Sequence, residues 1–213
     1  DTAIIAVRNV ASFSVGIYVA TACLDRGEEI RPELLKYYTE YFLQVTEHCR
    51  QYAIQVVLEP IERHRFKKLL LGPTAECAAF IADARKNGAA NAYLMMDIAH
   101  LPLMEETIDE ALAVSLPVGL IHVHMGDAVL DPSSIFYGHT HPPVGVQGGI
   151  FDVPQLTEQF VKLFECGYIP KTPGEKRANI SLEVSVSEQT SIQFMYEKMK
   201  SACDAAAGQL GIY

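Results

Sequence analysis

The sequence predicts an α/β fold in which a parallel sheet is covered by helices. Three observations support this prediction: short apolar segments alternate with helical patterns, the apolar segments are almost continuous in their hydrophobicity, and the helical patterns carry terminal signals. Strands that are buried on both faces have this continuous apolar character, as the strands of a parallel sheet do. Such an alternation is compatible with an open doubly wound sheet or with a closed (β/α)8 barrel.

Five strands are expected, each short and rich in Val, Ile, Leu or Tyr. In chain order they are residues 12–20, 53–60, 92–97, 119–127 and 180–185. Helices are expected over residues 32–52, 74–87, 104–114, 152–166 and 187–208. Pro32 in a first turn, Thr74 and Asp152 as N-caps, and Gly88 and Gly167 after the helix ends mark several of these boundaries. The helix over 104–114 is acidic in its first turn, and residues 1–11 are expected to be the tail of a helix.

The composition is typical of a soluble globular protein, and we expect a single domain over residues 1–213. A net charge of -9 argues against a protein that mainly binds nucleic acid. The apolar uncharged run over residues 9–24 is shorter than the ~20 residues of a membrane helix and contains Ser and Thr. The five cysteines are scattered and form no C-x-x-C pair, which indicates reduced cysteines and a cytoplasmic location.

Four successive strands end in an ionisable side chain. The residues are Glu59, Asp97, His124 and Glu183, each at the end of an otherwise apolar strand. A carboxylate at the end of a buried strand is costly without a counter-charge, and a shared divalent cation is the simplest one. Ligands from four neighbouring strands converge on one point of a barrel axis but spread along the edge of an open sheet. The pattern therefore favours the closed barrel.

The composition of this ligand set also predicts the metal. Three carboxylates and one imidazole form an oxygen-rich site, and no cysteine stands at a ligand position. Such a set favours Mn²⁺, with Mg²⁺ or Co²⁺ as alternatives, over Zn²⁺.

The stretch IHVHMGD at residues 121–127 contains two histidines with different expected roles. His122 and His124 are two residues apart on a strand, so their side chains share a face. His124 lies at the carboxyl end, level with the other ligands, and is the expected ligand. His122 lies about 7 Å further back and is expected to be a hydrogen-bonded histidine that supports the site and borders the substrate.

The motifs VVLEPIERHRF, LMMDIAH, IHVHMGD and ISLEVS together resemble the sugar phosphate isomerase/epimerase superfamily. This is the xylose isomerase-like TIM barrel, which includes ketose 3-epimerases, hydroxypyruvate isomerase and the zinc AP endonucleases of family 2. The resemblance covers residues ~1–210 and corresponds to the C-terminal five strands of the barrel. About three N-terminal βα units are then missing, so we expect an incomplete chain or a partner, such as a second copy, that closes the barrel.

The resemblance implies a metal-dependent isomerase or epimerase that acts on a sugar or a sugar phosphate. It implies the same four metal ligands, with Glu59 and Glu183 acting as general base and acid through an enediolate. His100 and Arg63 are implied to contact the substrate, beside His122, for which strand geometry predicts that place. A multi-zinc phosphodiesterase like the AP endonucleases and a non-catalytic carbohydrate-binding relative are the alternatives.

One loop departs from the pattern of the ketose 3-epimerases. The arginine that usually follows the H-x-H motif by six residues is replaced by Leu130, and the loop YGHTHPPVGVQGGIFD adds His139 and His141. Histidines beside prolines in a loop usually face solvent, and we expect this here, with further metal ligands as the alternative. The basic cluster RHRFKK at residues 63–68 is either a nucleic-acid contact or a solvated loop.

Overall fold

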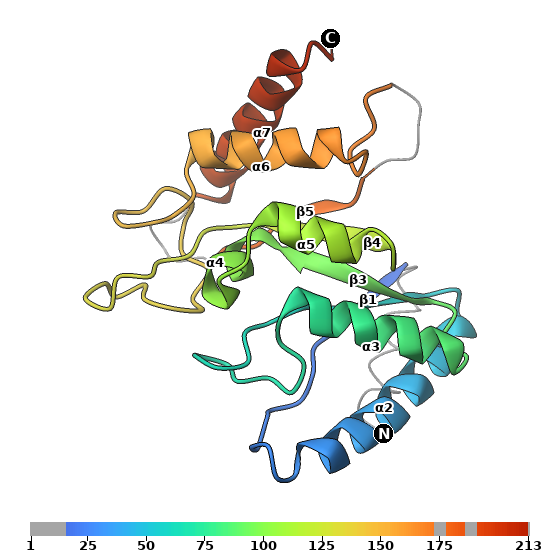
Figure 1. The fold of residues 1–213 in the computed structure, drawn as a ribbon. Helices are drawn as coiled ribbons and strands as arrows, with labels where there is room; N and C mark the ends of the chain where they lie inside the picture. The colour runs from blue at the N-terminus through green and yellow to red at the C-terminus, as the bar shows by residue number, and fades with distance from the viewer. Residues whose placement is uncertain (1–15, 173–177, 186–190, 213) are drawn as a thin grey trace. The chain divides into compact units, whose positions relative to one another are not determined.

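The computed structural model describes residues 16–172, 178–185 and 191–212 and confirms the alternation of strands and helices (Figure 1). The elements are β1 (Ile17–Ala20), α2 (Arg31–Arg50), β2 (Gln55–Leu58), α3 (Thr74–Lys86), β3 (Ala92–Asp97), the 3-10 turn η1 (Ile98–His100), α4 (Leu101–Met104), α5 (Ile108–Ser115), β4 (Leu120–Met125), α6 (Val153–Glu165), β5 (Ile180–Leu182) and α7 (Ile192–Gln209). The strand order is β1-β2-β3-β4-β5, and the pairs β1–β2, β2–β3 and β4–β5 are parallel, as predicted.

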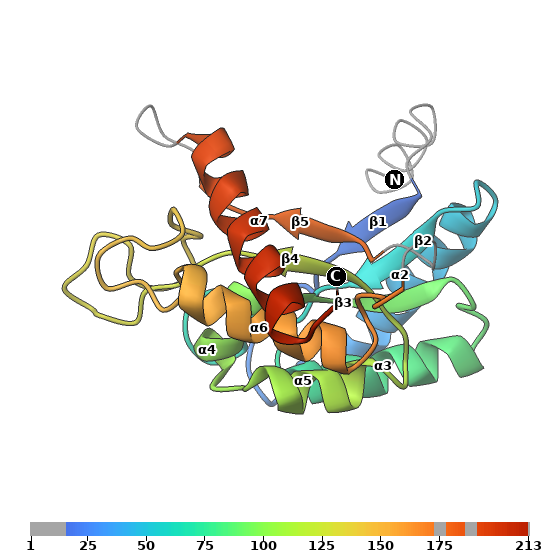
Figure 2. The same ribbon diagram turned by 90° about the horizontal axis from the view of Figure 1, so that it is seen from above.

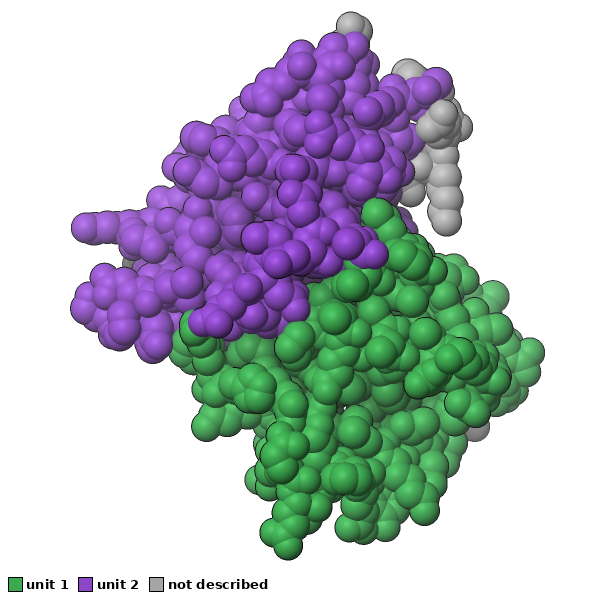
Figure 3. All heavy atoms as spheres, in the orientation of Figure 1, with its two compact units in different colours: residues 1–95, 114–121 green, residues 96–113, 122–213 purple. Residues whose placement is uncertain are grey.

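The chain divides into two compact units, coloured separately in Figure 3. The first unit comprises residues 1–95 and 114–121, and the second comprises residues 96–113 and 122–213. Strands β3 and β4 each begin in the first unit and end in the second.

The first unit has a core between its strands and helices α2 and α3. Helix α2 buries Tyr38, Phe42, Val45 and Cys49, which recur at spacings of three and four residues and so share one face. Phe42 packs edge-on against Phe80 with ring centroids 5.1 Å apart, which joins α2 to α3.

The second unit is built on β4, β5 and the helix pair α6 and α7, which pack against each other (Figure 2). Asp152 caps α6 through a capping box with Gln155, and Gly167 follows the helix with a φ of 78°. The predicted N-cap and the predicted stop are therefore both confirmed. Residues from several elements are fully or almost fully buried here: Val123, Met125, Leu156, Phe160, Leu163, Ala202 and Ala206.

One predicted N-cap and one predicted helix start are wrong, while the predicted start of α3 at residue 74 is confirmed. Pro73 takes the N-cap position of α3 without a side-chain cap, and Thr74 is already the first helical residue. The helix expected over 104–114 is two pieces, because Glu105 has a left-handed backbone (φ 61°) that ends α4. The acidic residues at the start of α5 are Asp109 and Glu110. The tail expected over 1–11, the start of the strand over 12–20 and the start of the helix over 187–208 lie outside the described residues.

In the part of the chain that the structure describes, no helix combines the length and the apolar character needed to cross a membrane. All five cysteines are free, in agreement with the prediction that they are reduced.

Candidate metal centre

Strand β4 brings its two histidines to one face of the second unit. The rings of His122 and His124 meet edge to face with centroids 4.8 Å apart, while Val123 between them is fully buried on the other face. His122 Nε2 lies 3.4 Å from the Ser181 hydroxyl of the neighbouring strand. Burial and then the nearby His124 lower the pKa of His122. A neutral His122 fits the supporting role predicted for it.

Asp97 ends strand β3 and is buried in the second unit. Its Oδ1 accepts a hydrogen bond from the Ala99 N–H at 2.7 Å. Its Oδ2 has no hydrogen-bond partner among the described residues, although imidazole nitrogens of His100, His124 and His141 lie 3.5, 3.8 and 3.7 Å away. An orphaned buried oxygen facing three imidazoles fits a cation that the four groups would share.

The pKa of Asp97 shows how strongly this environment favours a negative charge. Burial raises the pKa of this carboxyl, but the imidazoles of His100, His141 and His124 outweigh burial and bring it down to about 2. Asp97 is therefore a carboxylate at neutral pH, as a metal ligand must be.

Glu183 follows β5 directly and is held beside β4 by its own backbone. Its N–H donates to the Met125 carbonyl at 2.9 Å, which continues the β4–β5 ladder by one residue. Its Oε2 is in direct contact with His124 Nδ1, and its Oε1 lies 3.7 Å from His141 Nε2. Burial lowers the pKa of His124, but Asp97 and Glu183 outweigh burial and raise it to about 10. The two carboxylates therefore favour a positive charge between them.

The second unit thus brings together three of the four predicted ligands. One ligand atom each from Asp97, His124 and Glu183 lies within 4.8 Å of the others, which is the spacing of groups that surround one ion. Glu59 belongs to the first unit, where it follows β2 and is buried, and its N–H donates to the Ala20 carbonyl at 2.9 Å. Its role as the fourth ligand stays a prediction.

Arg63, predicted to contact the substrate, has two carboxylate partners within the first unit. Its Nε donates to Asp25 at 2.7 Å, and its Nη2 pairs with Glu28. Its side chain is only 15% exposed, and the hydrogen bond to Asp25 raises its pKa further. A substrate would have to compete with Asp25 and Glu28 for this guanidinium. The predicted substrate contact of Arg63 stays a prediction.

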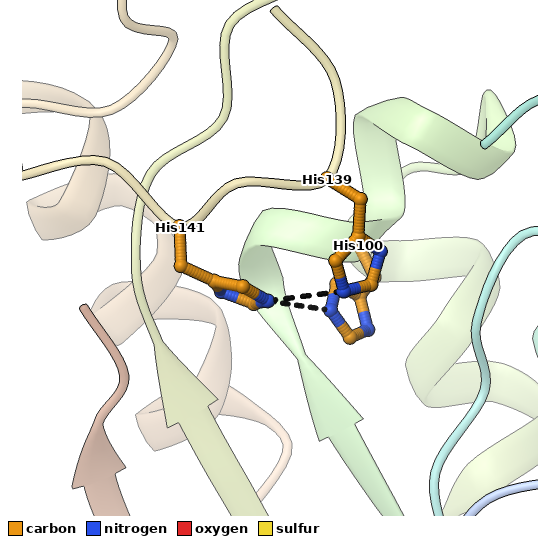
Figure 4. Close-up of side chains that lie close together, drawn as sticks. All are labelled: His100, His139 and His141. Carbon is orange, nitrogen blue, oxygen red and sulfur yellow. Dashed lines mark hydrogen bonds between the residues drawn. The ribbon is translucent and has the colours of Figure 1, made fainter. Parts of the chain in front are cut away.

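A second group of imidazoles lies in the same unit. His139 and His141 come from the loop after β4 and point toward His100 of η1, as Figure 4 shows. His141 Nε2 lies 3.2 Å from both His100 Nε2 and His139 Nε2. The expectation that these loop histidines face solvent is wrong, because His141 is only 12% exposed and His139 is half-buried. We call His100, His139 and His141 the imidazole triad.

The triad has the dimensions of a metal site. In a tetrahedral site with metal–nitrogen bonds of about 2.0–2.1 Å, the ligand nitrogens are about 3.3 Å apart, close to the two distances observed. A hydrogen bond joins one N–H to one lone pair, so protons cannot satisfy three nitrogens that meet at one point. The repeated H-x-H spacing at 122–124 and 139–141 was the only sequence signal for this group.

No family model and no curated protein matches this sequence. Solved structures do resemble it, with identities of 14% to 17%. The 3-keto-D-glucoside 4-epimerase of E. coli is 15% identical with a TM-score of 0.65, over 94% of this chain and 68% of that one. The IolI protein, crystallised with a bound zinc atom, is 14% identical with a TM-score of 0.62, over 99% of this chain and 67% of that one.

An AP endonuclease of family 2 from Brucella melitensis is also similar, at 14% identity and a TM-score of 0.58, over 85% of this chain and 60% of that one. At these identities the likenesses show the fold. That fold is a TIM-type α/β barrel, and this chain spans about two thirds of the length of the first two structures. The predicted fold class, an α/β fold of the TIM-barrel type, is therefore confirmed.

Proposed function

We propose that this chain is part of a divalent-metal-dependent isomerase or epimerase that acts on a sugar or a sugar phosphate. The observation that carries the proposal is the convergence of Asp97, His124 and Glu183, in which the buried Asp97 Oδ2 lacks a hydrogen-bond partner among the described residues. The likeness to a sugar epimerase supports the substrate class.

The proposed centre holds one ion between Asp97, His124, Glu183 and Glu59. Its three carboxylates favour Mn²⁺, with Mg²⁺ or Co²⁺ as alternatives. When bound, such an ion acts as a Lewis acid that stabilises negative charge on neighbouring carbonyl and hydroxyl oxygens. We further propose that the imidazole triad binds a second ion, for which three nitrogen ligands favour Zn²⁺ or Co²⁺.

In this proposal Glu59 and Glu183 move protons at a carbon next to a carbonyl. One carboxylate removes the proton to give an enediolate, and the other carboxyl returns a proton. Return to the opposite face of the same carbon gives epimerisation, and return to the neighbouring carbon gives isomerisation. His122, and Arg63 if it leaves its carboxylate partners, would orient hydroxyl or phosphate groups. His100 would contact the substrate from its position beside Asp97 and would also be one of the three nitrogen ligands of the triad.

The test measures solvent deuterium exchange into a panel of ketoses, keto acids and inositol derivatives in the presence of Mn²⁺. The wild-type chain should exchange the proton next to the carbonyl of at least one compound, and Glu183→Gln should lower that rate by at least about 100-fold. Glu158→Gln on the exposed face of α6 is the matched control and should keep the wild-type rate. An active Glu183→Gln variant would refute the assignment of Glu183.

A second candidate function is a multi-zinc phosphodiesterase. The imidazole triad favours it, because nitrogen ligands suit zinc, and so does the likeness to an AP endonuclease. The net charge of -9 argues against it, as does the pairing of Arg63 with Asp25 and Glu28. Cleavage of duplex DNA at an abasic site by the zinc-loaded chain, without deuterium exchange into any sugar, would select this function.

The free cysteines fit our further proposal of a cytoplasmic location.

A further inference from the structure

The loop that carries two of the triad histidines is organised around a single carboxylate. We infer that Asp127 is a positioning residue that holds residues 126–151, the histidine loop, in its metal-binding shape before any ion is bound. The inference rests on the proposal that the imidazole triad binds an ion.

Asp127 is fully buried and accepts hydrogen bonds from both ends of the loop. Its Oδ1 accepts from the N–H groups of Ala128, Ile150 and Phe151 at 2.8, 2.9 and 2.8 Å. Its Oδ2 accepts from the Gly145 N–H at 3.1 Å. A buried carboxylate is tolerated only where such donors replace water, and here they are main-chain groups 18 to 24 residues further along, apart from Ala128. The side chain therefore closes the loop on itself.

The glycine beside this carboxylate shows how closely the loop fits it. A Cβ on Gly149 would overlap Asp127 Oδ2, so a side chain at position 149 and the carboxylate cannot occupy the same place. The N–H of Gly149 donates to the Val146 carbonyl at 2.9 Å, which fixes the turn that brings Ile150 to Asp127. The loop sequence is thus matched to a carboxylate at position 127.

The histidine pair is fixed from its other side by Ser185. The Ser185 N–H donates to the His141 carbonyl at 2.6 Å, and its hydroxyl donates to the Thr140 carbonyl at 2.6 Å. His141 has a φ of 46°, in the left-handed region that a residue with a side chain rarely adopts. Such a conformation persists only where the surroundings impose it. Ser185 holds the backbone directly at this point, and Asp127 closes the loop that carries it.

This arrangement matters for binding because ordering a loop costs free energy. When the loop is already ordered in the folded chain, its ordering free energy is not subtracted from the free energy of ion binding, so the ion binds more tightly. Groups that orient metal ligands without touching the metal typically change affinity by 10- to 100-fold. We therefore expect Asp127 to control the affinity of the triad, but not that of the centre at Asp97, His124 and Glu183.

The test is a titration of the metal-free chain with Co²⁺, followed by visible absorption and by calorimetry. His139→Ala identifies the triad site as the binding event that it removes. Asp127→Asn, which keeps the shape but not the charge, should weaken that event by about 10- to 100-fold and change the other event by less than about twofold. Asp131→Asn is the matched control. This exposed aspartate lies in the same loop, its side chain accepts hydrogen bonds from the N–H and the hydroxyl of Ser133, and its replacement should leave both events unchanged.

Amide hydrogen exchange of the metal-free chain tests the loop without any ion. Asp127→Asn should speed exchange at Gly145, Ile150 and Phe151 but not in the α6–α7 pair. Ser185→Ala is a milder variant, available if Asp127→Asn does not fold, and should weaken the triad event in the same selective way. Unchanged exchange, or equal weakening of both Co²⁺ events, would overturn the inference. A wild-type chain without the His139-dependent event would instead refute the proposed second ion, and with it the role of Asp127 in binding that ion.

Discussion

Gly126 lies where β4 meets the end of β5, and it offers a steric test of the metal centre that changes no ligand. A Cβ on this glycine would lie 2.8 Å from the Glu183 carbonyl oxygen, 3.5 Å from Ala99 Cβ and 3.8 Å from His141 Nδ1. Its φ is not in the left-handed region, so Gly126→Ala adds a methyl group without backbone strain at position 126. The perturbation is therefore a collision with the backbone of one ligand.

The size of the displacement follows from the contact distance. The Cβ would be roughly 0.6 Å closer to the Glu183 oxygen than the 3.4 Å of an ordinary contact, so the end of β5 must move by about that much. Metal and catalytic groups tolerate displacements of only about 0.5 Å before function suffers. We expect Mn²⁺ affinity to fall at least 10-fold, while the free energy of unfolding of the metal-free chain falls by only about 1–3 kcal/mol.

Isothermal calorimetry with Mn²⁺ measures the affinity, and urea unfolding of the metal-free chain measures stability. Gly208→Ala in α7, where an added Cβ has no neighbour within 4 Å, is the matched control and should bind Mn²⁺ like the wild type. Wild-type affinity in Gly126→Ala would refute the reasoning, because the Glu183 backbone would then have moved without consequence for the ion. A Gly126→Ala chain that is already unfolded before urea is added would show instead that the junction of β4 and β5 cannot adjust.

Mn²⁺ at 100 times its dissociation constant should stabilise the wild-type chain by about 2.7 kcal/mol in thermal or urea unfolding, and a chelator should reverse this, whereas Asp97→Asn should show no such gain. The hydrogen bond from Arg63 lowers the pKa of Asp25, so this ion pair stabilises the folded chain above the ordinary pKa of 3.8, and the contribution is lost as the pH falls through the lowered value. Asp25→Asn should thus be less stable by about 1–2 kcal/mol at pH 7 in urea unfolding, with the difference shrinking below pH 3.8. Asp152→Ala removes the N-cap of α6 and the carboxylate partner of Lys198, and should lower the free energy of unfolding by about 1–2 kcal/mol in the same assay. An unchanged free energy of unfolding would show that the cap does not stabilise the chain.

The strands and the ligands at their ends were predictable because both follow from local pattern. A buried parallel strand is continuous in its apolarity, and the residue that breaks the run stands at the carboxyl edge of the sheet. The pattern predicts Asp97, His124 and Glu183 at strand ends, and the structure has Asp97 as the last residue of β3, His124 one residue before the end of β4 and Glu183 directly after β5. Helix boundaries were less predictable, because the left-handed Glu105 ends α4 without a glycine to announce it.

The partners of Arg63 could not be read from the sequence, because they are set by tertiary contacts. Asp25 and Glu28 stand 38 and 35 residues before it, in the segment after β1, and no periodicity connects them. Motif matching places an arginine near a substrate, but it gives no information on which carboxylates already hold the guanidinium.

The two H-x-H pairs show where local reasoning stops. His122 and His124 share a face because a strand repeats every two residues, so the spacing alone determines their relation. His139 and His141 have the same spacing, but no regular element relates their side chains. Their convergence on His100 depends on a left-handed residue and on hydrogen bonds from Ser185, while their loop is closed by the buried carboxylate of Asp127. The same H-x-H pattern therefore predicts the relative positions of two side chains when it lies on a strand. In a loop, those positions can be predicted only when the contacts that hold the loop are known.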